Sequence, residues 1–274
     1  MKDHLKRILW VFSTKVLVPS DLVGCIKPAN YLNMKKAVLY PETDIDELLN
    51  NTNPKIIIFG KCLHENMIKL AAQAKKKNII TISCFNDWHF NALSTKQEKQ
   101  FKLNYKLFKK SDYVVVKTNY AKEIIRLNLG SNSHVIPDCL RFNGLEIPES
   151  FQNDLEILWF GAPTNHDTLL KGLDEIEEKK IKINVNVVSI ISDSIIQELN
   201  DKNFQYIGIR LFPFSDKTLL NLALQSKAII IPLINDHARH VKSSNRIIDS
   251  LNFGRFLIKS YTDANREFDK YCYV

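Results

Sequence analysis

The chain has 274 residues, of which 45% are hydrophobic and 25% charged, which fits a globular protein of two domains and excludes a largely disordered chain. No stretch approaches the roughly 18 apolar residues that a membrane-spanning helix needs. The net charge of +8 comes from dispersed lysines. They are typical of helix ends, with contact to a membrane surface as the second interpretation, and no nucleic-acid partner is expected because no aromatic platform or recognition-helix pattern accompanies them.

Apolar runs typical of buried strands alternate with segments of helical periodicity along the first half of the chain. Strands are predicted at residues 8–12, 16–18, 55–60, 79–83, 113–116 and 135–136, and helices at 63–74 and 120–129. Gly130 marks the end of the second helix. The run at 8–12 is too short for a signal-peptide core and no small-residue cleavage site follows it, so we expect a cytoplasmic protein, with peripheral membrane contact as an option.

The alternation lapses between Arg141 and Asn153, where Gly144, Pro148 and Ser150 indicate a linker. It resumes with strands predicted at 155–160, 183–190, 205–209, 228–231 and 256–258, and helices at 169–176, 194–199, 215–223 and 243–253. Such alternation favours βαβ units and parallel sheets. We therefore expect an α/β protein with a first lobe at 1–142, a linker at 143–153 and a second lobe at 154–274.

The segment from Ile229 to Ile258 carries the most informative group of polar side chains. A buried strand is followed, at a predicted helix start, by Lys242, Ser243, Ser244, Asn245 and Arg246. The N–H groups at a helix N-terminus carry partial positive charge, so a phosphate is well accommodated beside a lysine and hydroxyls. One turn later, Asp249 is placed to accept hydrogen bonds from ribose hydroxyls. Spacing alone leaves an alternative open, in which Ser244 is a helix cap and Asp249 a surface acid.

This segment resembles the donor-binding region of the GT-B glycosyltransferases called group 1 or family four. There, a strand ending in proline precedes a Lys-Ser segment, a helix acid, a glycine and an apolar strand. Lys242-Ser243, Asp249, Gly254 and Phe256–Ile258 keep this order. The family's helix acid is usually a glutamate that contacts ribose, and a second acid lies eight positions earlier. That position is Val241 in this chain, so the two-acid motif is incomplete.

Two other segments of the second half resemble the same family. The run ending at Phe160-Gly161 matches the strand that opens the second lobe, and Lys171-Gly172 matches the Lys-Gly pair that follows it. In the family this lysine and an arginine just past the first glycine bind the diphosphate. Ala162 and Pro163 stand where the arginine is expected, so only Gly161 and Lys171 carry over. An exposed helix lysine is the alternative for Lys171.

In the first half, Ser111–Val116 and Val135–Asp138 resemble a strand of the family's first lobe and the turn into its linker. Ile82–Phe90 resembles a strand followed by an acidic and histidine turn that faces the cleft between the lobes. The resemblance implies that Asp87 and His89 are the catalytic candidates, facing the donor sugar or the acceptor. The alternative for His89 is a loop residue that packs near a tryptophan.

Motifs of other chemistries are missing. The sequence has no G-x-x-x-x-G-K-[ST] loop, no G-x-G-x-x-G after a strand and no G-x-S-x-G elbow. His237 and His240 are three positions apart, but no nearby cysteine or third histidine completes a metal site. The five cysteines form no C-x-x-C pair, which argues against zinc and against a disulfide framework.

The resemblance extends over nearly the whole chain and implies two Rossmann-like lobes with a nucleotide-sugar site between them. It implies transfer of a sugar from a nucleotide diphosphate-sugar to a glycan or lipid-linked acceptor in surface polysaccharide synthesis. Retention of configuration is implied, with no metal and no other cofactor. The chain ends early relative to the family, soon after residues 266–268, so a shortened second lobe is expected. Two alternatives stay open: a module that binds a ligand or partner without turnover, and a nucleotide-sugar 2-epimerase.

Overall fold

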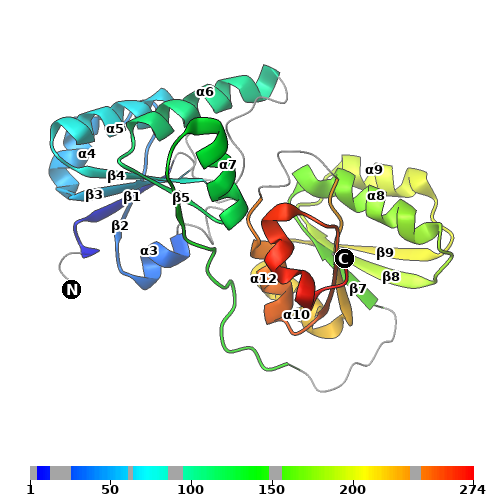
Figure 1. The fold of residues 1–274 in the computed structure, drawn as a ribbon. Coiled ribbons are helices and arrows are strands. Elements are labelled where there is room, and N and C mark those ends of the chain that lie inside the picture. Colours follow the sequence, from blue (N-terminus) through cyan, green and yellow to red (C-terminus); the bar gives the residue numbers. More distant parts are fainter. Residues whose placement is uncertain (1–4, 13–25, 61–63, 86–94, 148–155, 235–241) are drawn as a thin grey trace. The chain divides into compact units, whose positions relative to one another are not determined.

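The computed structural model describes residues 5–12, 26–60, 64–85, 95–147, 156–234 and 242–274. These residues form two compact units. Unit 1 holds the described residues up to Cys139 together with Lys242 and Ser243, and unit 2 holds the others, from Leu140 onward. Each unit is built around one parallel sheet with helices on both of its faces (Figure 1).

Unit 1 contains a sheet of six parallel strands in the order β2-β1-β3-β4-β5-β6. The strands are β1 (Ile8–Phe12), β2 (Lys35–Val38), β3 (Ile56–Phe59), β4 (Ile80–Phe85), β5 (Tyr113–Val116) and β6 (His134–Val135). The helices are α3 (Lys27–Tyr31), α4 (Ile45–Thr52), α5 (Glu65–Lys76), α6 (Thr95–Lys110) and α7 (Asn119–Leu129).

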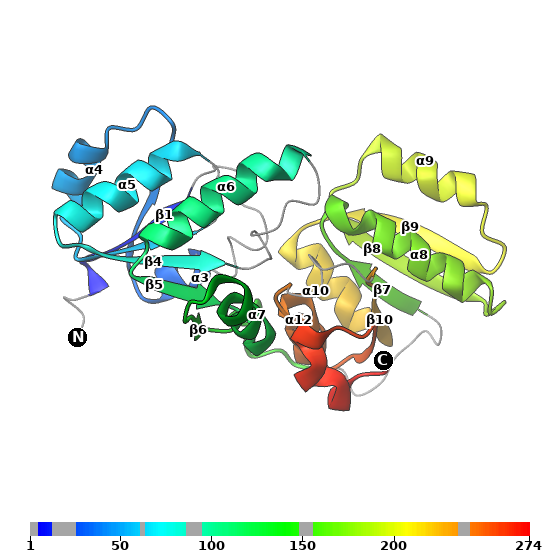
Figure 2. The same ribbon diagram turned by 45° about the horizontal axis from the view of Figure 1, so that its top comes forward.

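Strand β1 shows how the alternation of side chains builds the two layers of unit 1. Leu9 and Val11 point to the face covered by α4, α5 and α6, where they join a core that includes Met67. Trp10 and Phe12 point to the opposite face and pack with residues of α3. Figures 1 and 2 show α4, α5 and α6 together on one side of the sheet.

Unit 2 contains a sheet of five parallel strands in the order β11-β10-β7-β8-β9. The strands are β7 (Glu156–Phe160), β8 (Ile183–Ser189), β9 (Ile207–Pro213), β10 (Ala228–Ile231) and β11 (Phe256–Lys259). The α-helices are α8 (His166–Glu177), α9 (Asp193–Lys202), α10 (Asp216–Gln225) and α12 (Asn245–Asn252). Short 3₁₀ segments lie at η2 (Pro163–Asn165) and η3 (Asp263–Tyr271).

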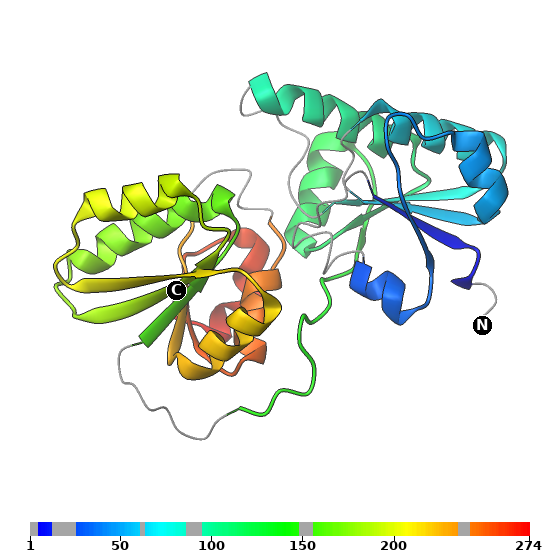
Figure 3. The same cartoon turned by 180° about the vertical axis from the view of Figure 1, so that it is seen from behind.

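Two cores fill unit 2, one on each face of its sheet. Trp159, Leu169 and Leu173 belong to the core under α8 and α9. Leu158 and Phe160 belong to the core under α10 and α12. The two helical layers can be followed on opposite sides of the sheet in Figures 1 and 3. Alternation along β7 therefore sends its apolar side chains into both cores, as a strand buried on both faces requires.

The structure confirms the α/β fold class and the two parallel sheets. Strands β1, β5 and β10 have the predicted bounds. The strand expected at 205–209 lies at Ile207–Pro213, because pairing with β8 continues through Leu211 and Phe212. The strand expected at 16–18 lies outside the described residues. Elements β2, α3, α4 and α6 are additions to the predicted set.

The strand order of unit 2 reverses next to β7. From β7 the chain moves outward to β8 and β9, and it then returns to the other side of β7 as β10 and continues to β11. In open α/β sheets, ligands bind outside the carboxyl ends of the strands at such a reversal. The place to look for a site in unit 2 is therefore the region just after Phe160 and Ile231.

The segment that enters unit 2 is packed against α12 and the turn that follows it. Arg141 is buried, with its Nε atom 3.2 Å from Oδ2 of Asp249. Phe142 joins the core beneath α12. Ile147 lies against Gly254, where a Cβ atom would come within 2.5 Å of the isoleucine Cδ1 and where φ is +65°. Gly254 is therefore required both by the backbone conformation and by this close approach.

Candidate functional site

Gly161 lies at the carboxyl end of β7 and has no room for a side chain. A Cβ atom built there would lie 2.8 Å from two ring atoms of Trp159, which is fully buried. The N–H of Gly161 donates to the carbonyl of Val188 at 3.1 Å, which continues the ladder between β7 and β8 beyond Phe160. At the strand reversal, the backbone therefore has no side chain at position 161, and its hydrogen bond to Val188 fixes its orientation.

Ser189 and His166 form a buried hydrogen-bond network that ends at the carbonyl of Gly161. The Ser189 hydroxyl donates to the carbonyl of Gly161 at 2.8 Å. Its oxygen lies 2.8 Å from Nε2 of His166, the first residue of α8. Because the serine proton is used toward Gly161, Nε2 carries the proton of the histidine and donates to the serine oxygen. These hydrogen bonds connect the end of β8, the start of α8 and the carbonyl of Gly161.

Burial lowers the pKa of His166 below its ordinary value of 6.5, against the opposing effect of Glu198 and Asp167. The imidazole also packs against the indole of Trp159, with 5.9 Å between ring centroids. A neutral imidazole is therefore the stable form in this packing. Ser189 and His166 are functional candidates that sequence patterns miss. The only signal is a serine that closes an apolar strand and a histidine five positions after Gly161.

Arg246 is the cationic side chain that the structure brings to Gly161. It projects from the first turn of α12, and its Nη1 atom lies 3.4 Å from the carbonyl oxygen of Phe160. The same atom would be 3.4 Å from a Cβ at position 161. Arg246 is half-buried. Two predicted site residues, Gly161 and Arg246, therefore meet at the strand reversal although 85 positions separate them in the sequence.

The N-terminus of α12 has an unusual arrangement of polar groups. Ser244 occupies the N-cap position, but its side chain accepts no hydrogen bond from the helix. Its hydroxyl donates instead to Oδ1 of Asn265, and both residues are buried. Asn245 accepts a hydrogen bond from the backbone N–H of Arg246 at 2.7 Å. The expected helix start is thus confirmed, while the cap function considered for Ser244 is replaced by a link to η3.

Asp249 is not a surface acid. Its side chain is 2% exposed and lies in the ion pair with Arg141, whose side chain is 3% exposed. The guanidinium also lies 3.6 Å from Asp216 and 5.5 Å from the ring of Phe214. This arrangement directs the carboxylate of Asp249 toward the segment that enters unit 2. A contact with ribose stays a prediction, and it requires the carboxylate to share or exchange its arginine partner.

Lys171 and Gly172 have different environments on α8. Gly172 faces the sheet, where a Cβ atom would lie 2.7 Å from Pro232, the residue that follows β10. Lys171 is exposed and lies 3.9 Å from Glu175 of the same helix. The glycine allows α8 to approach Pro232 closely, and the lysine points to solvent. The diphosphate contact implied for Lys171 stays a prediction.

The remaining predicted residues are not brought to this site by the described structure. Lys242 and Ser243 are half-buried, directly precede Ser244, and group with unit 1. Asp87 and His89 lie outside the described residues, as do His237 and His240. Their roles stay predictions.

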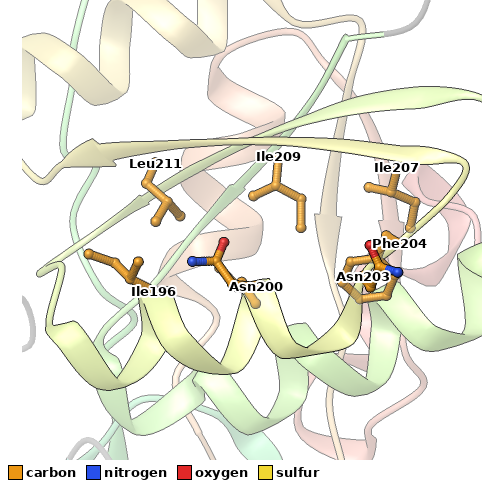
Figure 4. A pocket seen from close by; sticks show the side chains of 8 residues that line it. Ile196, Asn200, Asn203, Phe204, Ile207, Ile209 and Leu211 are labelled. Carbon is orange, nitrogen blue, oxygen red and sulfur yellow. The ribbon is translucent and has the colours of Figure 1, made fainter.

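A pocket of about 280 Å³ lies elsewhere in unit 2, between α9 and β9 (Figure 4). Ile207, Ile209 and Leu211 of β9 face Ile196 and Asn200 of α9 across it. Strand β9 is an edge strand, separated from β7 by β8. Six apolar side chains and two asparagines line the pocket, and neither Gly161 nor Arg246 is among them, so it does not belong to the candidate site.

Solved structures of known proteins share the fold. HepE from Anabaena, in complex with UDP and glucose, has a TM-score of 0.66 at 9% identity, covering 95% of this chain and 82% of that chain. The lipopolysaccharide outer core galactosyltransferase WaaB, in its apo form, has a TM-score of 0.55 at 14% identity, covering 95% and 82%. UDP-GlcNAc 2-epimerase from Neisseria meningitidis, bound to UDP-GlcNAc, has a TM-score of 0.51 at 11% identity, covering 95% and 84%. No protein-family model and no curated protein sequence matches the chain.

These similarities define the class to which the fold belongs. The protein has the GT-B fold, with one parallel sheet and two helical layers in each unit. The galactosyltransferase WaaB, the UDP-GlcNAc 2-epimerase and HepE, whose structure contains UDP and glucose, are built on the same plan. In the part of the chain that the structure describes, no helix combines the length and the apolar character that crossing a bilayer demands.

Proposed function

We propose that the protein is a glycosyltransferase that moves a sugar from a nucleotide diphosphate-sugar to a glycan or lipid-linked acceptor. The observation that carries the proposal is the meeting of Arg246 with the bare backbone of Gly161 at the strand reversal of unit 2. A guanidinium beside unsubstituted backbone suits a diphosphate, because the anion gains charge-assisted hydrogen bonds and meets no side chain.

The reaction breaks the bond between the sugar and the diphosphate, so negative charge grows on the departing diphosphate. Arg246 and the N–H groups at the start of α12 supply fixed positive charge at that place. Such groups help most when they are already oriented before the reaction. Ser189 and His166 contribute indirectly, because they hold the carbonyl of Gly161 and therefore the direction of the backbone at the reversal.

The other proposed roles rest on the family resemblance. Lys242, Ser243 and Lys171 are additional phosphate ligands, and Asp87 and His89 of the first lobe face the donor sugar or the acceptor. Retention of configuration, independence from metal, a cytoplasmic location and a role in surface polysaccharide synthesis belong to the same proposal. The HepE structure contains UDP and glucose, which supports UDP-sugars as the first donors to test.

The test is a donor panel that separates binding from turnover. Nucleotides and nucleotide-sugars are titrated by calorimetry, and the products with glycan and lipid-linked acceptors are identified by mass spectrometry. Arg246→Gln removes the guanidinium and is expected to weaken nucleotide diphosphate binding about 10- to 100-fold, the range for loss of a charged hydrogen-bond partner. Lys182→Gln is the control, since this exposed lysine directly precedes β8, at the amino end of the sheet and away from the proposed site. Equal affinities for the wild type and Arg246→Gln contradict the proposed site.

A nucleotide-sugar 2-epimerase is the second candidate, supported by the similarity to the epimerase from Neisseria meningitidis. The same mass spectrometry distinguishes the two reactions. Epimerised sugar released without an acceptor favours the epimerase, whereas transfer to an acceptor favours the glycosyltransferase. Nucleotide binding with neither product indicates a module that binds without turnover.

A further inference from the structure

The outer surfaces of the two units differ sharply in charge. Helices α5 and α6, which cover one face of the unit 1 sheet, contain nine lysines and two glutamates, a net charge of +7. Helices α8 and α9 hold the corresponding place in unit 2 and contain two lysines and seven acidic residues, a net charge of −5. Of these two corresponding helical layers, that of unit 1 is therefore strongly basic and that of unit 2 acidic.

The lysines of α6 form a stripe along its exposed side. Lys99, Lys102, Lys106 and Lys109 recur every three or four residues and are exposed, which places them on one face of the helix. The opposite face is apolar: Leu103 and Leu107 are buried in the core of unit 1. Packing of this apolar face against the sheet therefore keeps the lysines on the solvent side of α6.

Helix α5 extends the same basic surface. It lies beside α6 on the same side of the sheet (Figures 1 and 2), and Lys106 of α6 bonds to Glu65 of α5 at 2.8 Å. Lys69, Lys75 and Lys76 of α5 are exposed. We call these exposed lysines of α5 and α6 the α5–α6 lysine face: Lys69, Lys75, Lys76, Lys99, Lys102, Lys106, Lys109 and Lys110.

Ion pairs within the surface neutralise little of this charge. Lys102 pairs with Glu98 at 2.6 Å and Lys106 pairs with Glu65 at 2.8 Å. Both pairs are about half exposed, and exposed pairs of this kind contribute little energy and remain open to competition from other anions. The two glutamates leave most of the lysines available to an external anionic partner.

We propose that the α5–α6 lysine face docks unit 1 on the anionic headgroups of a lipid bilayer. Lysines clustered on a helix surface are attracted to anionic lipids, each by about a fivefold change in partitioning when it is close to the surface. The two helices contain no arginine. Arginine, which binds phosphates and guanines through paired hydrogen bonds, is the usual residue for nucleic-acid recognition, so lysine alone favours a diffuse anionic surface.

The attraction is electrostatic and does not involve insertion. Among the described side chains of α5 and α6, none of the large apolar ones is exposed; Phe101 and Tyr105 pack inward with Phe108. Binding is consequently strong at low ionic strength and falls as salt screens the lysines. The proposal is independent of catalysis, because it concerns partitioning of the protein and not turnover.

The test is sedimentation with vesicles of the full chain and two matched variants. The test variant carries Lys69→Gln, Lys76→Gln, Lys99→Gln and Lys110→Gln. The control variant carries Lys179→Gln, Lys180→Gln, Lys182→Gln and Lys217→Gln, which removes the same number of exposed charges from unit 2. Vesicles are pure phosphatidylcholine, or phosphatidylcholine with about one third phosphatidylglycerol. Melting temperatures of both variants verify that they are folded.

The wild type is expected to bind anionic vesicles and not neutral ones. The test variant is expected to lose at least a factor of about ten in partitioning, and the control variant about a factor of two or less. Equal losses in the two variants, or no binding of the wild type to anionic vesicles, overturn the proposal. So does tighter binding to a DNA duplex than to anionic vesicles at the same ionic strength, since that result assigns the face to nucleic acid.

Discussion

The two units share one architecture but differ in the polar and charged groups at the carboxyl ends of their strands. In unit 1, Lys117 follows β5 and Asp138 follows β6, and they form an ion pair at 3.3 Å with side chains 5% and 4% exposed. Beside this pair, burial raises the pKa of the Cys84 thiol to about 11. In unit 2, the corresponding end carries the bare backbone of Gly161 and the half-buried Arg246. The cation that follows β5 in unit 1 is therefore buried, whereas the guanidinium beside Gly161 in unit 2 is partly accessible.

The largest effect is expected from breaking the ion pair of unit 1. Asp138→Leu leaves the ammonium of Lys117 buried without its carboxylate, and the free energy of unfolding is expected to fall by about 3–5 kcal/mol. Urea denaturation followed by circular dichroism measures the loss. The double variant Lys117→Met with Asp138→Leu removes both charges and should regain most of it. A double variant as unstable as the single one would show that packing, and not the unpaired charge, is responsible.

A smaller loss is expected when the bare backbone of unit 2 receives a methyl group. In Gly161→Ala the new Cβ collides with the ring of Trp159, and such overpacking costs about 1–3 kcal/mol of stability. Urea denaturation again gives the value. The matched control is Gly161→Ala in a Trp159→Phe background, because phenylalanine lacks the two ring atoms that the methyl group meets. If the alanine costs as much stability in that background, the collision is not the cause.

The third prediction concerns the pH dependence of unit 2. Because the pKa of His166 is lowered in the folded protein, the unfolded chain binds a proton at this residue more readily as the pH falls below 6.5. The histidine therefore destabilises the fold in this range, by at most about 1.4 kcal/mol per pH unit, and the loss stops growing below the folded pKa. The unfolding free energy of the wild type, measured between about pH 7.5 and 5, should fall more steeply with decreasing pH than that of His166→Gln. Parallel curves would contradict the assignment.

The smallest effect on stability is expected from removing a helix cap, which α7 has and α12 lacks. Thr118 caps α7, since its Oγ1 accepts a hydrogen bond from the N–H of Ala121 at 3.1 Å, whereas Ser244 gives α12 no such cap. Thr118→Ala is expected to lower the free energy of unfolding by about 1 kcal/mol, and Thr118→Ser, which keeps the hydroxyl, by much less. Denaturation curves of the two variants provide the measurement. Identical curves would mean that the cap contributes nothing.

Local patterns in the sequence account for most of the fold. The apolar runs predict β1, β5 and β10 at their observed bounds, because each is a short buried strand with polar residues at its ends. Gly130 ends α7 with φ at +57°, as a glycine in that place predicts. Strand β2 escapes prediction because it lies at the sheet edge and two of its four residues are exposed lysines. Helix α3 has five residues, too few for helical periodicity to show.

The site is less accessible to sequence reasoning than the fold. The helix start at Asn245 is predictable from local residues, and so is Gly161 as the end of a strand. Their meeting depends on the sheet order, which sends β10 back beside β7. The contacts of Ser189 with Gly161 and His166 span 28 and 23 positions and depend on the register of β8. The partner of Asp249 lies in the segment before β7, where no periodicity indicates packing.

The position of β7 has a consequence for synthesis of the chain. This apolar strand pairs with β8 soon after both have been made, but its other edge must wait for β10, whose first residue comes 68 positions after Phe160. At ribosomal rates of about 5–20 residues per second, that edge stays unpaired for roughly 3 to 14 s. During this interval an unprotected edge can pair with another chain. The nascent protein is therefore most prone to aggregation, and most in need of a chaperone, while β8, β9 and α10 are being translated.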